Sequence, residues 1–535
     1  MIRKQGIITE QFDFLINTLH NTGQFWPNIN TETLMITSET QVLFSDFLNS
    51  FKQTLKDVFY KKEDITKFIQ KRGLPPQVLK DIMATKPFSV AIPEKYGGRG
   101  GKTKEVLGVL DAASYESLPL SLMFGINMGL FLGPVSKYAN ESVKKDIFER
   151  FLKHQNMGGL MITEPDYGSD ALNMHTSNTP ENQGYHIKGV KHWQGLTGMA
   201  DYWLIATRQK LESGELSRNI DFFISDNQQK NQHIEVEEYY NNIGLYPIPY
   251  GKNKIDIHVP EEQKLQPETT GLKLMMDLLH RSRFQFPGMA IGFIRRMLDE
   301  AIQHTNARVI RGKPLMALDQ VKYQVSEIQN AYTVGSAMCA RSAEFSGIDT
   351  DLSASTVEAN TMKAYITDLM QQSSQTLTQL FGANGYKAES VASRGIIDSR
   401  PFRVFEGSNE MLYTQISVMA MKMMSRLKKM NLADFLKDYS LTQNSADYFK
   451  SLLDFKVDID LSQRKQVGLG KIISRIVAAN YVADVGAKGF RKDLIRDSFE
   501  SIKQEVAGLV SSFQHSPAVT PIESYKEQSS WLDYC

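Results

Sequence analysis

The sequence has little cysteine, no excess of charge and no long apolar run. Only Cys339 and Cys535 occur in 535 residues, which argues against a disulfide framework and fits a reducing compartment. The 61 basic and 60 acidic side chains nearly cancel, so no overall field would draw the chain to nucleic acid or anionic lipid. The most apolar stretch, residues 118–135, contains proline, glycine and asparagine and falls short of the roughly 18 to 20 apolar residues of a membrane span, so it predicts a buried helix. The first ten residues show no signal-peptide pattern, and we expect a cytoplasmic protein.

Several common binding motifs are also missing. Residues 97–103 look like a phosphate-binding loop, but Tyr96 stands where its first glycine is required, so they predict a plain glycine turn. No Gly-x-Gly-x-x-Gly follows a predicted strand, and the ten histidines show none of the spacings typical of metal sites, so we expect neither a Rossmann site nor a metal. Residues 421–535 have only a small basic excess, which a solvated helix face explains without nucleic acid.

Hydrophobic periodicity divides the chain into helical and strand-rich regions. Apolar residues recur every three or four positions in the first and last parts of the chain and alternate in the middle, as in residues 255–259. The pattern predicts a mainly α protein with a small central β-barrel or sheet domain. The predicted regions are an N-terminal extension (1–37), an N-terminal helical domain (38–157), a middle β domain (158–265), a C-terminal helix bundle (266–425) and an additional helical domain (426–535).

Two short blocks carry candidate chemistry. In residues 400–410 a single carboxylate, Glu406, stands between an aromatic residue and a glycine, where a base can be held in an apolar slot. Residues 162–170 are rich in turn formers whose hydroxyls and amides suit a flat polar ring or a phosphate. Taken singly, each residue has a plainer interpretation: Glu406 as a helix-initiating glutamate, Thr163 as a cap, Trp193 as sheet core and Arg283 as a surface ion pair.

Seven motifs in register give these blocks a common context. They are Pro93-Glu94-x-x-Gly97-Gly98, Thr163-Glu164-Pro165-x-x-Gly168-Ser169-Asp170, Gly189-x-Lys191-x-Trp193 followed by Ala200-Asp201, Arg308-x-x-x-Gly312 with Gln320, Gln379-x-x-Gly382-x-x-Gly385-Tyr386, Asp398, and Glu406-Gly407-Ser408. Their order resembles the acyl-CoA dehydrogenase family over roughly residues 85–420. An extra C-terminal helical domain is similar to that of the longer members.

The resemblance implies an FAD enzyme that converts acyl-CoA thioesters to trans-2-enoyl-CoA in fatty-acid β-oxidation. It makes Glu406 the base that takes the α proton while hydride passes to flavin N5. Some relatives carry the base on an earlier helix, but that position falls near Ser282, where no carboxylate stands. The implied cofactor-binding residues are Thr163, Ser169, Trp193, Arg308, Gln320, Gln379, Gly382, Ser408 and Glu410. The implied substrate-binding residues are Ser169, Arg283 and Gly407.

The resemblance also implies partners and leaves alternatives open. In the family the groups around Arg308 and Gln379 serve a neighbouring subunit, so we expect a homodimer or homotetramer, with an electron-transferring flavoprotein as acceptor. Gly195 stands where the family usually has threonine or serine near flavin N5, which puts the flavin's tuning in question. A flavin oxidase or monooxygenase on the same scaffold, and a nucleic-acid-binding alkylation-response flavoprotein, are the alternative functions. Glycines 125, 129 and 133 are candidates for lining an acyl pocket or for plain helix packing.

Overall fold

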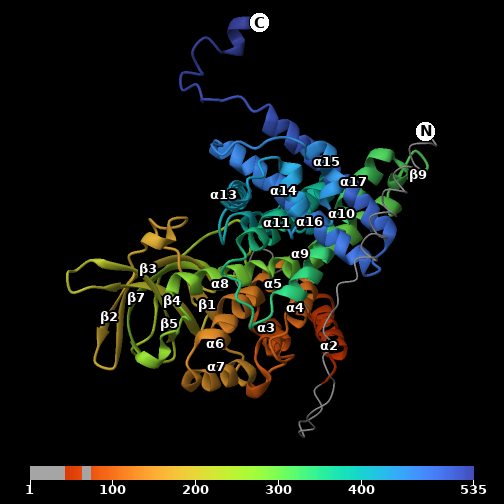
Figure 1. The fold of residues 1–535 in the computed structure, drawn as a ribbon. Helices are drawn as coiled ribbons and strands as arrows, with labels where there is room; N and C mark the ends of the chain where they lie inside the picture. The colour runs from red at the N-terminus through yellow and green to blue at the C-terminus, as the bar shows by residue number, and fades with distance from the viewer. Residues whose placement is uncertain (1–41, 63–73) are drawn as a thin grey trace, which may run out of the picture.

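The computed structural model describes residues 42–62 and 74–535, which form helical regions on either side of a β domain (Figure 1). The predicted extension, residues 1–37, lies outside the described residues. The first helical region confirms the helical periodicity: α2 turns Phe51 and Leu55 into the core. The helices of this region are α2 (Phe44–Lys56), α3 (Pro76–Met83), α4 (Thr103–Glu116), α5 (Leu118–Gly125), α6 (Gly133–Tyr138) and α7 (Glu141–Lys153).

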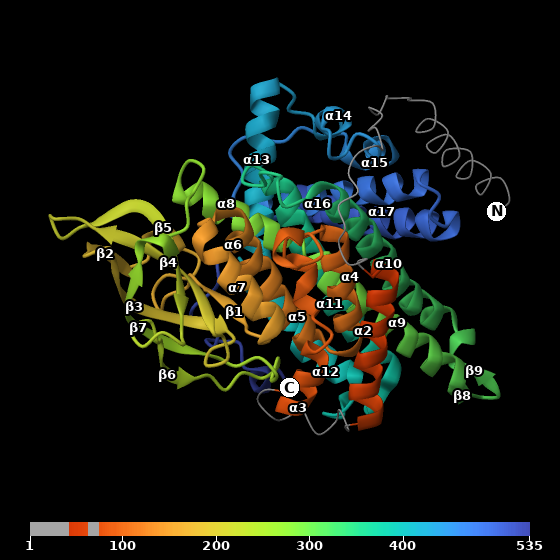
Figure 2. The ribbon, with the colours of Figure 1, turned by 90° about the horizontal axis from the view of Figure 1, so that it is seen from below.

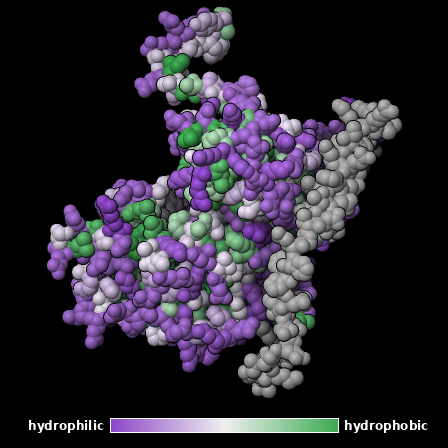
Figure 3. Space-filling model, viewed as in Figure 1, coloured by the Kyte–Doolittle hydropathy of each residue, from purple (hydrophilic) through white to green (hydrophobic). Residues whose placement is uncertain are grey.

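The most apolar segment forms one helix through the protein core. Helices α5 and α6 are joined by a π-helical segment, Ile126–Leu132, and Ser117 caps the start by accepting a hydrogen bond from the Leu120 amide. Leu118–Tyr138 is long and apolar enough to cross a membrane, yet 94% of its most apolar window is buried in the protein. The face of the molecule in Figure 3 is mostly hydrophilic, with hydrophobic side chains in smaller areas. This segment is therefore the buried helix that the sequence predicts.

The middle region is a seven-stranded sheet with both parallel and antiparallel pairs. The strand order is β1-β4-β2-β3-β7-β6, and β5 also pairs with β4, outside this order. The alternating residues 255–259 lie on β7, where isoleucine and valine face the core and polar residues face solvent. The strands are β1 (Gly158–Met161), β2 (Ser177–Glu181), β3 (Gly184–Gly195), β4 (Tyr202–Lys210), β5 (Leu216–Asp226), β6 (Glu235–Tyr239) and β7 (Tyr250–Pro260).

Long helices follow the sheet, and a short hairpin interrupts them. Helix α9 packs on α4, α10 and α11, so the first and third regions share one core. The elements are α8 (Gly271–Arg283), α9 (Phe286–Ala307), β8 (Val309–Ile310), β9 (Lys313–Pro314), α10 (Asp319–Phe345), α11 (Thr356–Phe381), α12 (Val391–Ser399) and α13 (Asn409–Leu427).

The last hundred residues confirm the expectation of extra helices. Helix α16 packs along α13 and α10, and α17 packs on α16 (Figure 2). Buried Arg475 on α16 joins the two regions, because its guanidinium donates to the Tyr413 hydroxyl on α13 at 2.8 Å and to Glu505 on α17 at 2.7 Å. The helices are α14 (Leu432–Asp438), α15 (Ala446–Leu453), α16 (Gln463–Ala487) and α17 (Lys492–Gln514).

Residues 97–103, which look like a phosphate-binding loop, form a glycine turn, as their spacing predicts. The Arg99 amide donates to the Ser89 carbonyl at 2.7 Å and the Gly100 amide to the Ile92 carbonyl at 2.9 Å, so these donors are used within the protein. The Arg99 side chain is paired with Glu105 at 2.6 Å in a buried position. The turn connects residue 92 to the start of α4.

Candidate active site

Glu406 lies on the loop that precedes α13, where α8 and α11 also contact it or its neighbours. Its Oε1 accepts a hydrogen bond of 2.9 Å from the Ser282 hydroxyl near the end of α8. Its Oε2 is buried and has no hydrogen-bond partner among the described residues. Burial raises the pKa of the Glu406 carboxyl, although Arg283, Ser282 and Lys363 each act to lower it. A buried carboxylate with one unpartnered oxygen is equipped to accept a proton.

The backbone around Glu406 adopts an unusual conformation that glycine makes possible. Glu406 and Gly407 have φ angles of +53° and +95°, and consecutive left-handed residues are costly for any residue except glycine. A Cβ atom on Gly407 would lie 2.7 Å from the Met411 methyl group and 3.0 Å from Leu412 Cδ2. The backbone conformation therefore favours glycine here, and any side chain would also have to displace the Met411 methyl group.

Two buried cations hold the carbonyl groups of this turn. Arg283 donates from Nη2 to the Glu406 carbonyl at 3.0 Å, and Lys363 donates from Nζ to the Gly407 carbonyl at 2.8 Å. Lys363 also donates to Asn409 Oδ1 at 3.0 Å, and Arg283 donates to Asn360 Oδ1 at 2.7 Å. The turn that carries the carboxylate is thus fixed by charge-assisted bonds from α8 and α11.

Both cations have pKa values below their ordinary range because they are buried. Burial lowers the pKa of Arg283 to about 10 and that of Lys363 to about 7, while the charge of Glu406 acts in the opposite direction on each. Arg283 is therefore charged at neutral pH, whereas Lys363 titrates near it. The surface ion pair, the plainer interpretation of Arg283, is wrong because Arg283 is only 4% exposed.

The Thr163 loop is held against the sheet by a buried ion pair. Lys191 on β3 donates to Glu164 at 2.9 Å and to the Ile162 carbonyl at 2.8 Å. Glu164 also accepts the backbone amides of residues 175 and 176 at 2.6 and 2.8 Å. Burial lowers the pKa of Lys191 to about 8. Burial also acts to raise the pKa of Glu164, but the charge of Lys191 and the amide donors outweigh this effect. The pKa of Glu164 therefore lies below its usual range. This pair fixes the loop, with the Thr163 carbonyl accepting the His192 amide at 3.0 Å.

Trp193 projects from the sheet instead of packing in it. The pairing of β3 with β7 shifts between residues 192 and 194, and Trp193 has a φ of +59°, so the strand bulges at this residue. Its side chain is 54% exposed and lies beside Tyr240, with ring centroids 4.5 Å apart. The interpretation of Trp193 as sheet core is therefore wrong.

The residue two positions after the bulge has no room for a larger side chain. A Cβ atom on Gly195 would lie 2.8 Å from Ile126 Cδ1 and 3.3 Å from Ile248 Cγ2. Those aliphatic groups occupy the space that a threonine or serine would need. A side chain at this position would therefore require Ile126 and Ile248 to shift.

Gly125 and Gly129, two of the three glycines singled out in the buried helix, are packing positions. A Cβ atom on Gly125 would lie 2.8 Å from the Met289 sulfur, and one on Gly129 would lie 2.8 Å from Gln285 Oε1. The two glycines therefore let this helix approach the start of α9 closely. Helix packing, one of the two interpretations of these glycines, accounts for both.

Four of the predicted cofactor-binding residues lie at the surface of the chain. Arg308, Gln320, Gln379 and Gly382 are all exposed, and Arg308 directly precedes the β8–β9 hairpin. Figures 1 and 2 both show this hairpin on the opposite side of the molecule from the seven-stranded sheet.

Other predicted residues lie near the two loops already described. Ser408 caps α13 by accepting the Met411 amide at 3.4 Å, and Glu410 is exposed in the first turn of that helix. Ser169 is exposed on the Thr163 loop.

Comparisons with known proteins agree with this architecture. Residues 46–155, 159–256 and 269–421 match the models of the N-terminal, middle and C-terminal domains of acyl-CoA dehydrogenase. The chain is similar to an acyl-CoA dehydrogenase of Bacillus subtilis, with 22% identity over 63% of this chain and 87% of the relative. It is also similar to a probable acyl-CoA dehydrogenase of Mycobacterium tuberculosis, with 26% identity over 63% of this chain and 53% of the relative. A third relative is a subunit of the caffeyl-CoA reductase–Etf complex of Acetobacterium woodii, with 24% identity over 71% and 99%.

One solved structure extends the likeness to the C-terminal helices. It is an acyl-CoA dehydrogenase from Bacillus anthracis complexed with FAD, with a TM-score of 0.71, 17% identity and coverage of 88% of this chain and 87% of the other. Residues 1–421 alone are too few to provide 88% of the chain. Part of the matched fold therefore lies in the C-terminal helices.

Proposed function

Because this chain belongs to the acyl-CoA dehydrogenase family, we propose that it oxidises the Cα–Cβ bond of acyl-CoA thioesters, with FAD as its cofactor and Glu406 as the base. The Cα–H bond breaks and its proton goes to the Glu406 carboxylate. FAD, when bound, accepts the Cβ hydrogen as hydride and with it two electrons, so the products are trans-2-enoyl-CoA and reduced flavin.

The unpartnered Oε2 of Glu406 is the observation that carries this proposal. Ser282 holds Oε1 and leaves Oε2 buried without a donor, so one lone pair is available for a proton. Burial raises the pKa of this carboxyl and makes it a stronger base at neutral pH than an exposed glutamate would be. A helix-initiating surface glutamate would show neither property.

The groups around Glu406 also suit the thioester. As the α proton leaves, negative charge develops on the thioester oxygen and requires fixed donors. The Glu406 amide is one candidate, because no hydrogen bond among the described residues uses it. Arg283 and Lys363 hold the carbonyl groups of Glu406 and Gly407, which fixes the turn that carries this amide.

Two features of the β domain fit an isoalloxazine ring. Trp193 is turned out of the sheet by a bulge and offers an exposed aromatic plane. The Thr163 loop is fixed by the buried Glu164–Lys191 pair, which places hydroxyl and amide donors at a constant position. We assign Thr163, Ser169 and Trp193 to the flavin side of the site, with Ser169 also serving the substrate.

The exposed cofactor candidates support an oligomer. Arg308, Gln320, Gln379 and Gly382 are exposed, and the hairpin that follows Arg308 lies on the opposite side of the molecule from the seven-stranded sheet. We propose that they contact the pyrophosphate and adenosine of FAD bound to a second copy, in a homodimer or homotetramer. Arg308 suits the pyrophosphate because a guanidinium forms charge-assisted bonds with phosphate oxygens.

The electron acceptor proposed for this chain is an electron-transferring flavoprotein. The relative from Acetobacterium woodii, a subunit of a complex with Etf, supports this assignment. We place the enzyme in the cytoplasm and in fatty-acid β-oxidation.

Anaerobic titration of the FAD-loaded protein tests the reaction class. We expect saturated acyl-CoA thioesters to bleach the flavin absorbance and to yield trans-2-enoyl-CoA, and a ladder of acyl lengths will identify the preferred chain. Free fatty acids and nitroalkanes serve as controls and should leave the flavin oxidised. Failure of every acyl-CoA thioester to bleach the flavin would contradict the proposal.

The surroundings of Gly195 favour one second candidate function, a flavin oxidase on the same scaffold. Ile126 and Ile248 fill the space of the usual hydroxyl side chain, so the position near flavin N5 is apolar. An oxidase would re-oxidise its flavin rapidly with oxygen and release hydrogen peroxide. A dehydrogenase, once reduced by acyl-CoA, should react with oxygen slowly.

A further inference from the structure

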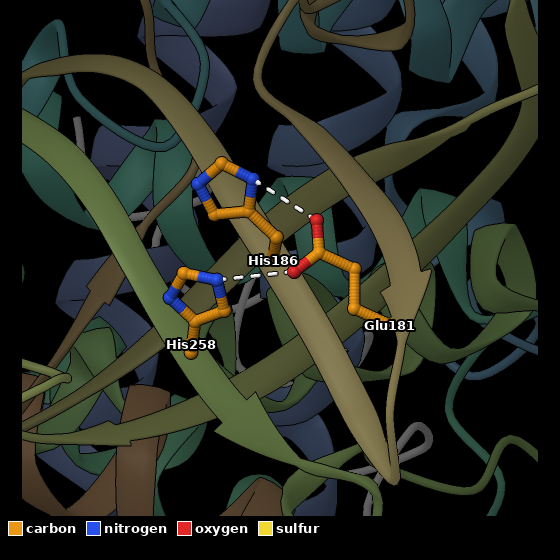
Figure 4. Close-up of side chains that lie close together, drawn as sticks. All are labelled: Glu181, His186 and His258. Carbon is orange, nitrogen blue, oxygen red and sulfur yellow. Dashed lines mark hydrogen bonds and ion pairs between the residues drawn. The ribbon is translucent and has the colours of Figure 1, made fainter.

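Three side chains with metal-binding atoms meet on the exposed face of the sheet. Glu181 ends β2, His186 lies on β3 and His258 lies on β7, and their candidate ligand atoms all lie within 4.8 Å of one another (Figure 4). The register places His186 directly opposite His258, and the two imidazole rings stack with centroids 4.6 Å apart and planes 10° apart. Neighbouring strands thus bring together two imidazoles and one carboxylate.

The hydrogen bonds of His186 leave two acceptors facing each other. Its Nε2 lies 2.7 Å from Asp256 Oδ1, so a neutral ring carries its proton on Nε2 and donates it to Asp256. Its Nδ1 then has a free lone pair and faces Glu181 Oε1 at 3.7 Å. His258 Nε2 forms a hydrogen bond of 3.1 Å with Glu181 Oε2, in which the imidazole donates. A bound cation would replace that proton and would also engage the free lone pair of His186 Nδ1.

The spacing of these atoms is close to what a tetrahedral metal ion requires. Two ligand atoms that are each about 2.1 Å from one zinc ion lie about 3.4 Å apart in tetrahedral geometry. His186 Nδ1 lies 3.7 Å from Oε1 of Glu181 and His258 Nε2 lies 3.1 Å from its Oε2, so each imidazole is near this distance from one carboxylate oxygen. Asp256 completes the arrangement as the carboxylate that orients a metal-binding histidine through its other ring nitrogen.

We propose that Glu181, His186 and His258 bind a divalent transition-metal ion of the zinc class, with the fourth position open to water. Imidazole and carboxylate ligands suit Zn²⁺ and related ions better than Ca²⁺ or Mg²⁺, which favour oxygen ligands alone. The ion joins β2, β3 and β7, so it clamps the β2–β3 hairpin to the sheet. His186 precedes Trp193 by seven residues on β3, a distance of about 23 Å at about 3.3 Å per residue, which makes the role structural.

Calorimetric titration of the FAD-loaded, full-length protein with ZnCl2 tests this site. We expect one zinc ion per chain with a micromolar dissociation constant, no binding by the His186→Ala/His258→Ala double variant, and at least tenfold weaker binding by Glu181→Gln. His233→Ala is the matched control, because His233 is an exposed histidine of the same domain outside the cluster, and it should bind zinc normally. Equal melting temperatures of all variants in metal-free buffer will show that they are folded.

The same variants give a second readout. Zinc should raise the melting temperature of the wild-type protein and of His233→Ala but not that of the double variant, because only a ligand that binds the folded state stabilises it. Absence of zinc binding by the wild type would overturn the proposal. Undiminished binding, or an equal thermal shift, in the double variant would overturn it as well.

Discussion

Replacing Lys363 with methionine should separate positioning of the base from folding. Lys363 is fully buried, and its ammonium group holds the Gly407 carbonyl at 2.8 Å and Asn409 Oδ1 at 3.0 Å. The substitution leaves both acceptors without this donor, which costs about 1 to 3 kcal/mol for each buried group. It also removes an ionisation penalty: the fall of the Lys363 pKa from 10.5 to about 7 corresponds to about 4 kcal/mol at pH 7.

These two effects oppose each other, so we expect the free energy of unfolding to change by no more than about 2 kcal/mol. Catalysis should suffer more, because a base displaced by about 1 Å can lose about 100-fold in rate. The rate constant for flavin reduction, measured by stopped-flow absorbance with saturating acyl-CoA, should therefore fall about 100-fold in Lys363→Met. Urea unfolding of the same samples measures the stability.

The pH dependence of the flavin-reduction rate tests the same role of Lys363 independently. Positive charge on Lys363 lowers the pKa of Glu406, so its removal raises that pKa further. Because the base must be ionised, the acidic limb of the reduction rate should move to higher pH. Lys363→Gln keeps an N–H donor without the charge, so it should show the same displaced limb with a smaller loss of rate. Wild-type rates and an unmoved limb in Lys363→Met would refute this role of Lys363.

Three further substitutions test strained or buried positions at the site and elsewhere in the chain. Gly407→Ala should lower activity and cost about 1 to 3 kcal/mol of stability in urea unfolding, because its Cβ would meet Met411 at 2.7 Å and its φ is +95°; an unchanged enzyme would contradict this. Burial raises the pKa of Asp398 to about 6. The folded protein therefore binds more protons at this site than the unfolded chain does, and the free energy of unfolding falls as the pH rises from about 4 to about 6. Asp398→Asn should remove that dependence and stabilise the protein at pH 7 by up to about 3 kcal/mol, which thermal melts at several pH values will check. Lys191→Met should destabilise by about 3 to 5 kcal/mol, because it leaves Glu164 as an unpaired buried charge, whereas Lys191→Met combined with Glu164→Gln should recover part of the loss.

Much of this architecture follows from local sequence patterns. Alternation of apolar and polar residues in 255–259 predicts a half-buried strand, and β7 confirms it. The apolar run from residue 118 predicts a buried helix because its glycines and prolines suit close packing better than lipid, and the structure buries it. Such features depend on residues close in sequence, so periodicity is enough to find them.

The groups that hold Glu406 depend on contacts that no local pattern encodes. Lys363 lies 43 residues before Glu406 on another helix, and a lysine among Asn360 and Thr361 looks like part of a polar face until α8 and α13 cover it. Helical polar residues are usually exposed, so the sequence offers only a weak signal that this face is buried.

No local sequence pattern reveals the histidine cluster either. Metal-site motifs rely on ligands a few residues apart, whereas His186 and His258 are 72 residues apart and meet through strand register. Trp193 illustrates the same limit, because a bulge that shifts pairing by one residue decides whether an aromatic faces the core or solvent.

Anaerobic reduction of the Glu406→Gln variant by acyl-CoA tests the central assignment most directly. Glutamine preserves the shape of the side chain and can still accept the Ser282 hydrogen bond, so FAD and substrate should bind as in the wild type. Without a carboxylate to take the α proton, the bound flavin should stay oxidised and the substrate should not exchange its α hydrogen with D2O. Full bleaching of the variant at the wild-type rate would show that another group removes the proton and would contradict the assignment of Glu406 as the base.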